Sequence, residues 1–262
     1  MARYNNILNV EEVSSTNVYL FSLLNAENAQ NISVVTAEFQ TAGKGQQGNS
    51  WHSERGRNLL FSHAVFPHAL AANNQFIISQ IVALALCKTL QSYGIDACIK
   101  WANDIYVGDK KIAGVLIENQ LRGNVVSTAV IGIGLNVNQT DFPQFLPNPT
   151  SMACCTQQNF DRKEVLEHYL QNFDALASAV TEITGKPVVE ALEVSVHNKE
   201  QKTIHNKYMI NLYRYKTPAR FADADGEFEG TIVDVEPSGK LIIRHAGGSL
   251  RSYYFKEVKF IV

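Results

Sequence analysis

The chain has 262 residues, of which 45% are hydrophobic and 18% are charged, and its formal net charge is −2. This length suits one large domain with or without a small one, and the near-neutral charge argues against a nucleic-acid binder that relies on bulk positive charge. No stretch reaches the roughly eighteen uninterrupted apolar residues of a membrane span, and the first residues lack the apolar run of a signal peptide. We therefore expect a cytoplasmic protein that has no membrane partner.

The cysteines give no sign of a metal site. Cys87, Cys98, Cys154 and Cys155 form no CxxC pair, and the histidines are scattered along the chain. The spacing therefore predicts no metal ligands. The adjacent Cys154 and Cys155 invite a redox interpretation, but two reduced cysteines in a loop or at a strand edge are the better expectation for a reducing cytoplasm.

In chain order, the first 140 residues alternate between helix-like and strand-like segments. Residues 14–17 precede an apolar stretch and predict a helix start. Apolar residues at helical spacing predict a helix over 74–93 that ends at Gly94. Gly108 and Asp109 suit a hairpin turn. Strands are predicted over 32–39, 59–66, 97–101, 105–107, 112–119 and 125–137, and a long polar loop over 40–57.

The remaining residues divide into a helical part and an all-β part. Asp161 and Glu164 form a capping-box pattern before an apolar helical stripe, and a further helix is expected over 188–197. From Tyr213 the texture changes to short β-type runs split by Gly and Pro turns, which predict a small barrel. These runs cover 219–221, 228–235, 241–244, 250–255 and 258–262. We expect domains over 1–212 and 213–262.

The first candidate site is the segment from Gln40 to Trp51, which reads QTAGKGQQGNSW. Its glycines allow the backbone to approach a ligand with N–H groups turned inward, and Lys44 adds a charge suited to a phosphate or a carboxylate. It is neither a Walker loop nor a dinucleotide fingerprint. A plain surface loop is the competing interpretation. Trp51 favours a ligand, because a tryptophan in a polar loop is either a local core residue or a stacking surface for a flat group such as adenine.

Two lysines near predicted strand ends form the second candidate. Lys100 begins the run Lys-Trp-Ala-Asn103-Asp104, and Lys111 precedes the apolar run Ile-Ala-Gly114. Lysines on paired strands can converge on one anion, and a positive charge beside a developing phosphoryl charge contributes several kcal/mol in a dry site. Two solvated surface lysines are the alternative, against which the apolar neighbours of Lys111 argue.

A glycine-rich strand end, Gly132-Ile-Gly134-Leu-Asn136, is the third candidate. The glycines either permit close strand packing or a bulge, or they let a flat ligand lie on the sheet with Asn136 as its polar partner. The sequence leaves both interpretations open.

With Ser15-Thr16-Asn17, these segments resemble the biotin–protein ligase family. The family's serine-threonine-asparagine start, glycine-rich biotin loop, Lys-Trp-(Pro)-Asn-Asp strand, Lys-(apolar)-Ala-Gly segment and Gly-x-Gly-x-Asn stretch appear here in order. The C-terminal runs from Tyr213 resemble the family's small barrel, so the resemblance covers nearly the whole chain. It implies an α+β fold, in which a mixed β-sheet catalytic domain flanked by helices, like that of class II synthetases, precedes an all-β SH3-like barrel.

The resemblance implies a role for each matching residue. Those matching biotin-binding positions are Ser15, Thr16, Asn17, Gln40, Gly43, Lys44, Gly45, Gln46, Lys111, Gly114, Gly132 and Gly134. Those matching nucleotide-binding positions are Lys44, Trp51, Asn103, Lys111 and Asn136. The catalytic residues implied are Lys111, Lys100 and Asp104, and no metal ligand is implied.

The implied activity has two steps. Its small substrates are biotin and ATP, and its cofactor is Mg²⁺. Biotin is activated as biotinyl-5'-AMP, and a lysine of a biotin carboxyl carrier protein then accepts the biotin. Asp104 is the residue expected to orient or deprotonate this carrier lysine. The chain starts almost directly at the catalytic domain, so we expect no DNA binding. The resemblance leaves open whether the protein forms a homodimer.

Three departures from the family pattern affect these expectations. Lys44 and Gln46 stand where family loops often have arginines, so one position loses the planar guanidinium and the other loses its charge. This bears on how tightly the adenylate is held. Ala102 replaces the usual proline. Lipoate–protein ligation, a non-catalytic biotin-binding protein, and a binding module whose barrel recruits a partner are the rival interpretations.

Overall fold

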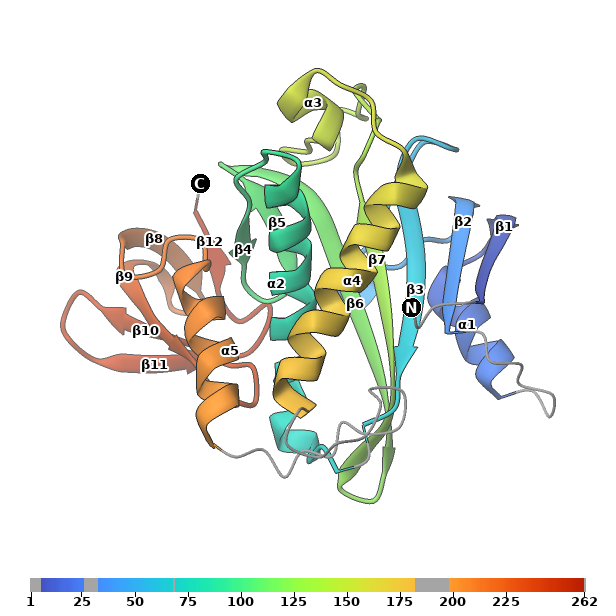
Figure 1. Cartoon of the computed structure of the whole chain (residues 1–262). Helices are drawn as coiled ribbons and strands as arrows, with labels where there is room; N and C mark the ends of the chain where they lie inside the picture. The colour runs from blue at the N-terminus through green and yellow to red at the C-terminus, as the bar shows by residue number, and fades with distance from the viewer. Residues whose placement is uncertain (1–5, 26–32, 68, 182–197, 262) are drawn as a thin grey trace.

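The computed structural model describes residues 6–25, 33–67, 69–181 and 198–261, and a seven-stranded mixed sheet forms its centre (Figure 1). The strand order is β1-β2-β3-β7-β6-β5-β4. β1 runs parallel to β2, and the other neighbouring strands are antiparallel. The strands are β1 (Ile7–Val13), β2 (Val34–Gln40), β3 (Leu59–Val65), β4 (Cys98–Lys100), β5 (Asp104–Val107), β6 (Lys110–Arg122) and β7 (Val125–Leu135).

Helices cover the two faces of this sheet unequally. The large apolar core lies between the sheet and α2 (Phe76–Ser92), α4 (Arg162–Thr181) and α5 (Asn198–Ile210), which Figure 1 shows along one face. Of the helices in the described ranges, only α1 (Thr16–Leu24) lies on the opposite face, packed on a small cluster that includes Leu20. Much of this second face therefore stays available for a site.

The alternation along β7 explains which face is which. Ile131, Ile133 and Leu135 are buried in the large core, whereas Gly132 and Gly134 point to the other face because successive side chains of a strand alternate. Gly132 pairs with Leu116 of β6 and Ser62 of β3, and Gly134 pairs with Gly114. The second face thus has a shallow strip where the strands carry no side chains.

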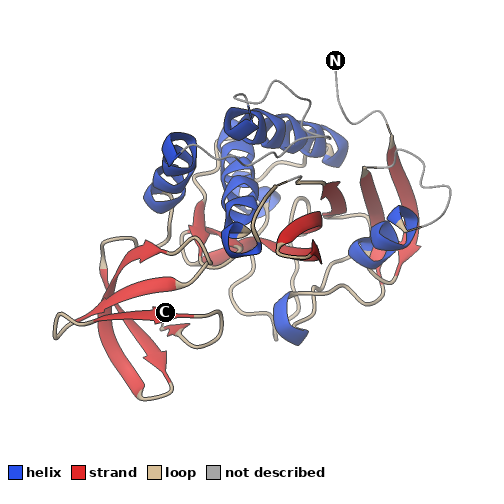
Figure 2. Cartoon of the chain, turned by 90° about the horizontal axis from the view of Figure 1, so that it is seen from below, coloured by secondary structure: helices blue, strands red, loops and turns tan. Residues whose placement is uncertain are grey.

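A five-stranded antiparallel sheet follows, in the order β11-β10-β9-β8-β12. Figure 2 shows it as an all-β unit beside the helices. Its strands are β8 (Pro218–Asp223), β9 (Gly226–Val235), β10 (Leu241–His245), β11 (Leu250–Tyr253) and β12 (Lys259–Phe260). The predicted α+β fold, a mixed sheet with helices followed by a small all-β unit, is confirmed. The boundary at residue 212 stays a prediction, and the backbone there pairs with Ile99 of β4.

Some elements differ from the sequence expectations. Strand β1, helix α5 and the five-residue helix α3 (Met152–Thr156) were not predicted, and the helix expected over 188–197 lies outside the described residues. Cys154 and Cys155 lie in α3 rather than in a loop or strand edge, because Ser151 caps this helix by accepting from the Cys154 amide at 3.0 Å. Both cysteines are free and exposed. None of the helices in the described part of the chain is long and apolar enough to cross a membrane.

Candidate active site

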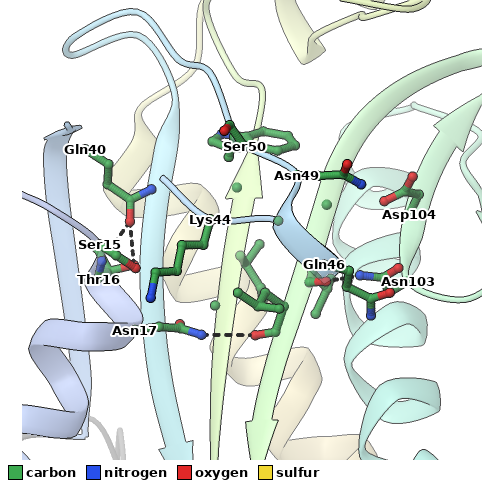
Figure 3. Close-up of a pocket in the computed structure, with 18 of the residues that line it drawn as sticks. Ser15, Thr16, Asn17, Gln40, Lys44, Gln46, Asn49, Ser50, Asn103 and Asp104 are labelled. Atoms are coloured by element: carbon green, nitrogen blue, oxygen red, sulfur yellow. Dashed lines mark hydrogen bonds between the residues drawn. The ribbon is translucent and has the colours of Figure 1, made fainter. Parts of the chain in front are cut away.

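A pocket opens on the second face of the sheet, between the start of α1, the 41–57 loop and the β4–β5 turn (Figure 3). Figure 3 shows Ser15, Thr16, Asn17 and Gln40 at one end and Asn103 and Asp104 at the other. We call these the α1 end and the β5 end. The complete lining is Ser15, Thr16, Asn17, Gln40, Lys44, Gly45, Gln46, Asn49, Ser50, Trp51, Asn103, Asp104, Lys111, Gly114, Val115, Leu116, Gly132, Ile133, Gly134 and Phe255.

At the α1 end, buried polar side chains form one hydrogen-bonded network. The carbonyl oxygen of the Gln40 side chain accepts from the Thr16 backbone N–H at 2.7 Å and from the Thr16 hydroxyl at 3.1 Å. The Ser62 Oγ lies 2.7 Å from the Thr16 Oγ1 and 2.6 Å from the Asn17 Oδ1. Burying these groups is tolerated because each has a partner. These contacts use only the oxygen of the Gln40 side chain, so its amide nitrogen is a candidate donor to a ligand.

Asn17 extends this network across the sheet. Its amide nitrogen donates to the Glu118 carboxylate at 2.7 Å and to the Leu116 carbonyl at 3.3 Å. A side chain at Gly132 would meet it, because a Cβ built there lies 2.2 Å from the Asn17 Oδ1. Gly132 is therefore required by Asn17 itself, in addition to any ligand.

Trp51 lies flat against the glycines of β6 and β7. A Cβ at Gly134 would lie 2.3 Å from the Trp51 Cε2, and a Cβ at Gly114 would lie 2.9 Å from its Cζ3. The indole N–H is buried and has no hydrogen-bond partner among the described residues. A buried donor without a partner is costly in a protein, so this N–H is a candidate contact for a ligand.

The loop that carries Trp51 is a small hairpin. Lys44 pairs with Ser50 in a β-bridge, the Gly45 amide donates to the Asn49 carbonyl at 2.6 Å, and residues 46–48 form a short 3-10 helix. Figure 3 shows the Lys44 side chain pointing toward the α1 end, whereas Gln46 lies near Asn103. The hairpin therefore spans the pocket from one end to the other.

An ion pair lies at the β5 end of the pocket. The Lys111 ammonium lies 2.7 Å from the Asp104 carboxylate and 5.6 Å from the centroid of the Trp51 ring. The backbone of Lys111 is fixed by the 148–150 segment, since its N–H donates to the Asn148 carbonyl at 2.7 Å and its carbonyl accepts from the Thr150 N–H at 2.9 Å. The position of this lysine is thus set by backbone contacts on both sides.

Three of the predicted site residues lie outside the pocket lining. Lys100 donates to the Tyr106 hydroxyl at 3.0 Å and lies 4.4 Å above the Tyr106 ring, and burial lowers the pKa of its ammonium. An aromatic face attracts a cation, which explains why this lysine does not join Lys111. Asn136 is buried and donates to the Thr150 carbonyl at 2.9 Å. Gly43 lies behind Trp51, whose backbone oxygen would be 2.7 Å from a Cβ there.

Several other residues that line or support the pocket were not predicted from the sequence. Ser62 has no local signal, because it is one hydroxyl in an apolar strand and acquires its partners, Thr16 and Asn17, only when α1 packs against β3. Phe255 comes from the C-terminal unit. Asn49, Ser50, Val115, Leu116 and Ile133 complete the set of lining residues that the sequence did not single out.

The described residues contain no cluster of three or more His, Cys, Asp or Glu side chains that could hold a metal ion. Asp104 does line the pocket. Mg²⁺ is commonly bound through one or two carboxylates together with substrate phosphates, so this donor set fits a magnesium ion that arrives with a nucleotide.

Comparison with known proteins decides the family. Residues 10–136 match the biotin/lipoate A/B protein ligase family. The bifunctional ligase/repressor BirA of Bacillus spizizenii is 33% identical over 245 residues, which span 92% of this chain and 70% of that protein. The chain belongs to the biotin–protein ligase family. A biotin–[acetyl-CoA-carboxylase] ligase of Paracoccus denitrificans is 28% identical over 227 residues, with 82% of this chain and 85% of that protein covered.

The fold agrees with a solved structure of the family. The biotin protein ligase from Aquifex aeolicus in complex with biotin and ATP has a TM-score of 0.70 and 24% identity, with 98% of this chain and 100% of that chain covered. Alignments with several other BirA proteins span half of their length or less. These comparisons establish the family of the chain but not its activity.

Proposed function

We propose that this protein activates biotin with ATP as biotinyl-5'-AMP and transfers the biotin to a lysine of a biotin carboxyl carrier protein. The observation that carries the proposal is the Lys111–Asp104 pair at the β5 end of a pocket whose other end carries the polar network around Thr16 and Gln40. The same substrates are supported by the Aquifex aeolicus biotin protein ligase, which is in complex with biotin and ATP, and by the Paracoccus denitrificans relative, which is a biotin–[acetyl-CoA-carboxylase] ligase.

In the first step the biotin carboxylate attacks the α-phosphorus of ATP, the new bond is a mixed anhydride, and pyrophosphate leaves. Two anions must approach each other, so cations in the pocket lower the barrier. We assign this work to Lys111, which is held beside Asp104, and to Lys44, whose side chain points toward the α1 end. Magnesium bound to the phosphates neutralises further charge when present.

In the second step a carrier lysine attacks the anhydride and AMP leaves. A free lysine has a pKa of about 10.4 and is mostly protonated at neutral pH, so a proton acceptor is needed. Asp104 is the carboxylate in the lining that we assign to this role. Its contact with Lys111 at 2.7 Å also holds that ammonium in place, so one residue serves both steps.

The test is release of pyrophosphate from ATP in the presence of biotin or lipoate and without a carrier. Release that depends on biotin supports the proposal. The matching family also includes lipoate ligases. Release with lipoate but not with biotin would therefore mean that lipoate is the acid that this adenylating chemistry activates. Biotin binding without release would favour the non-catalytic relative.

A further inference from the structure

One wall of the pocket comes from the C-terminal sheet. Phe255 lines the pocket and contacts the ring of Trp101, two residues before Asn103 of the β5 end. Every other lining residue of the described chain lies between residues 15 and 134. The small all-β unit therefore reaches into a site that the large sheet otherwise builds alone.

A tight turn presents Phe255 to the pocket. The turn lies between β11 and β12, where the Glu257 N–H donates to the Tyr254 carbonyl at 3.0 Å and the Glu257 carboxylate accepts from the Tyr254 N–H at 2.7 Å. Lys256, in this turn, has a φ of 74°, the left-handed region that few non-glycine residues adopt. The backbone at Phe255 is thus closely constrained.

Trp101 holds this turn against the large sheet. The Phe255 ring lies 6.1 Å from the Trp101 ring in an edge contact, and the buried indole of Trp101 donates to the Gly239 carbonyl at 2.8 Å. Gly239 has a φ of +92°, and a Cβ there would lie 2.8 Å from the Phe76 ring. The β9–β10 turn is therefore docked as closely as its backbone allows.

We propose that Phe255 is a wall residue of the pocket that contacts the nucleotide and that Trp101 is a positioning residue that acts through it. This rests on the proposed function and on the roles that the family resemblance implies, which put biotin at the α1 end beside Thr16 and Gln40 and the nucleotide at the β5 end beside Asn103. An aromatic side chain at that end offers a stacking surface to the base or a cover for the sugar. Biotin, at the far end, does not reach it.

The experiment measures the KM values for ATP and for biotin in pyrophosphate release, ATP binding by calorimetry, and thermal unfolding. Phe255→Ala raises the KM for ATP about tenfold, in line with the loss of one stacking contact, and leaves the KM for biotin within about twofold. Phe255→Tyr restores the low KM for ATP. Tyr254→Ala is the matched control, because this neighbour is 55% exposed and lies outside the lining.

The role of Trp101 is tested by a double-mutant cycle. Trp101→Phe removes the indole donor and keeps an aromatic ring, and it raises the KM for ATP by less than Phe255→Ala does. The double variant resembles Phe255→Ala, because residues that act through one another are not additive. Additive effects would overturn the positioning role.

The two proposals fail in different ways. A wild-type protein that releases no pyrophosphate with either acid counts against the proposed function, and the calorimetry then decides this inference by itself through the ATP affinity of Phe255→Ala. Equal changes in both KM values, or unchanged ATP binding and KM in Phe255→Ala, would overturn the inference while leaving the proposed function intact.

Discussion

The Lys111 ammonium and the Asp104 carboxylate face each other at 2.7 Å, with side chains 31% and 28% exposed. This partial burial separates the pair from an ordinary surface ion pair, which contributes little to stability. Asp104 begins β5 and Lys111 is the second residue of β6, so the hairpin at Gly108 brings both side chains to the same place.

Replacing Lys111 tests the first step. Lys111→Ala removes a fixed positive charge from the pocket, and we expect biotin-dependent pyrophosphate release to fall by about 10²–10³-fold, the range for loss of one electrostatic contact to a transition state. Lys110→Ala changes the exposed neighbouring lysine and should have no comparable effect. Near-normal release by Lys111→Ala would contradict the assignment.

Replacing Asp104 separates the two steps. Asp104→Asn keeps the shape and removes the proton acceptor, so transfer from preformed biotinyl-AMP to a carrier lysine should slow by about 10²–10⁴-fold, the usual contribution of a general base. Pyrophosphate release should change less. Rapid-quench measurement of each step gives the comparison, and a larger loss in adenylation than in transfer would reduce Asp104 to a support for Lys111.

Gln46 should govern how long the intermediate stays bound. Gln46→Arg places a charged donor in the hairpin near Asn103, and a hydrogen bond to a charged group contributes about 1.5–3 kcal/mol. We expect biotinyl-AMP to dissociate at least about tenfold more slowly. Trapping of released adenylate by a competing amine checks this, and an unchanged rate of release would show that position 46 does not hold the adenylate.

The glycine strip gives a prediction about packing. Gly134→Ala forces the Trp51 indole away, since a Cβ would lie 2.3 Å from it, and biotin binding should weaken by about tenfold or more. Gly247→Ala is the control, because a Cβ at that position has no neighbour within 4 Å. Equal biotin affinity in wild type and Gly134→Ala would mean that the indole moves without cost.

His63 makes the stability depend on pH. It is fully buried, and burial lowers its pKa from 6.5 to about 3. The unfolded chain binds a proton below about pH 6.5 that the folded chain refuses, so the free energy of unfolding is highest above that pH and falls by about 1.4 kcal/mol per pH unit on acidification toward pH 3. Urea unfolding at several pH values should show a shallower fall in His63→Gln than in wild type.

Much of the fold can be predicted from the sequence because the signals are local. The helix over Phe76–Ser92 has the apolar spacing of a buried helix, and the hairpin at Gly108 has a turn residue with a φ of +57°. Strand β1 escapes because its residues are half polar and only partly buried, as in many edge strands. Helix α3 has five residues, too few for a periodic pattern.

The site is less predictable because its contacts are distant in the sequence. The motifs place Gly114, Lys111 and Asp104 in one pocket, in agreement with the structure. Ser62 supports the site only through the packing of α1 on β3, and Phe255 joins the lining only through docking of the C-terminal unit. The Lys100 ammonium lies over the Tyr106 ring instead of in the pocket. The motif that contains Lys100 does not predict this contact.

The span of the α1-end network has a consequence for folding. Asn17 contacts Glu118 across 101 positions, and Thr16 contacts Gln40 and Ser62. These contacts join α1 to β2, β3 and β6, so the α1 end of the pocket exists only where these elements are packed together. A ligand that binds the native state alone shifts the folding equilibrium by about 2.7 kcal/mol at a hundred times its Kd. Any ligand of this pocket should therefore raise the melting temperature, and the rise should grow with ligand concentration relative to its Kd.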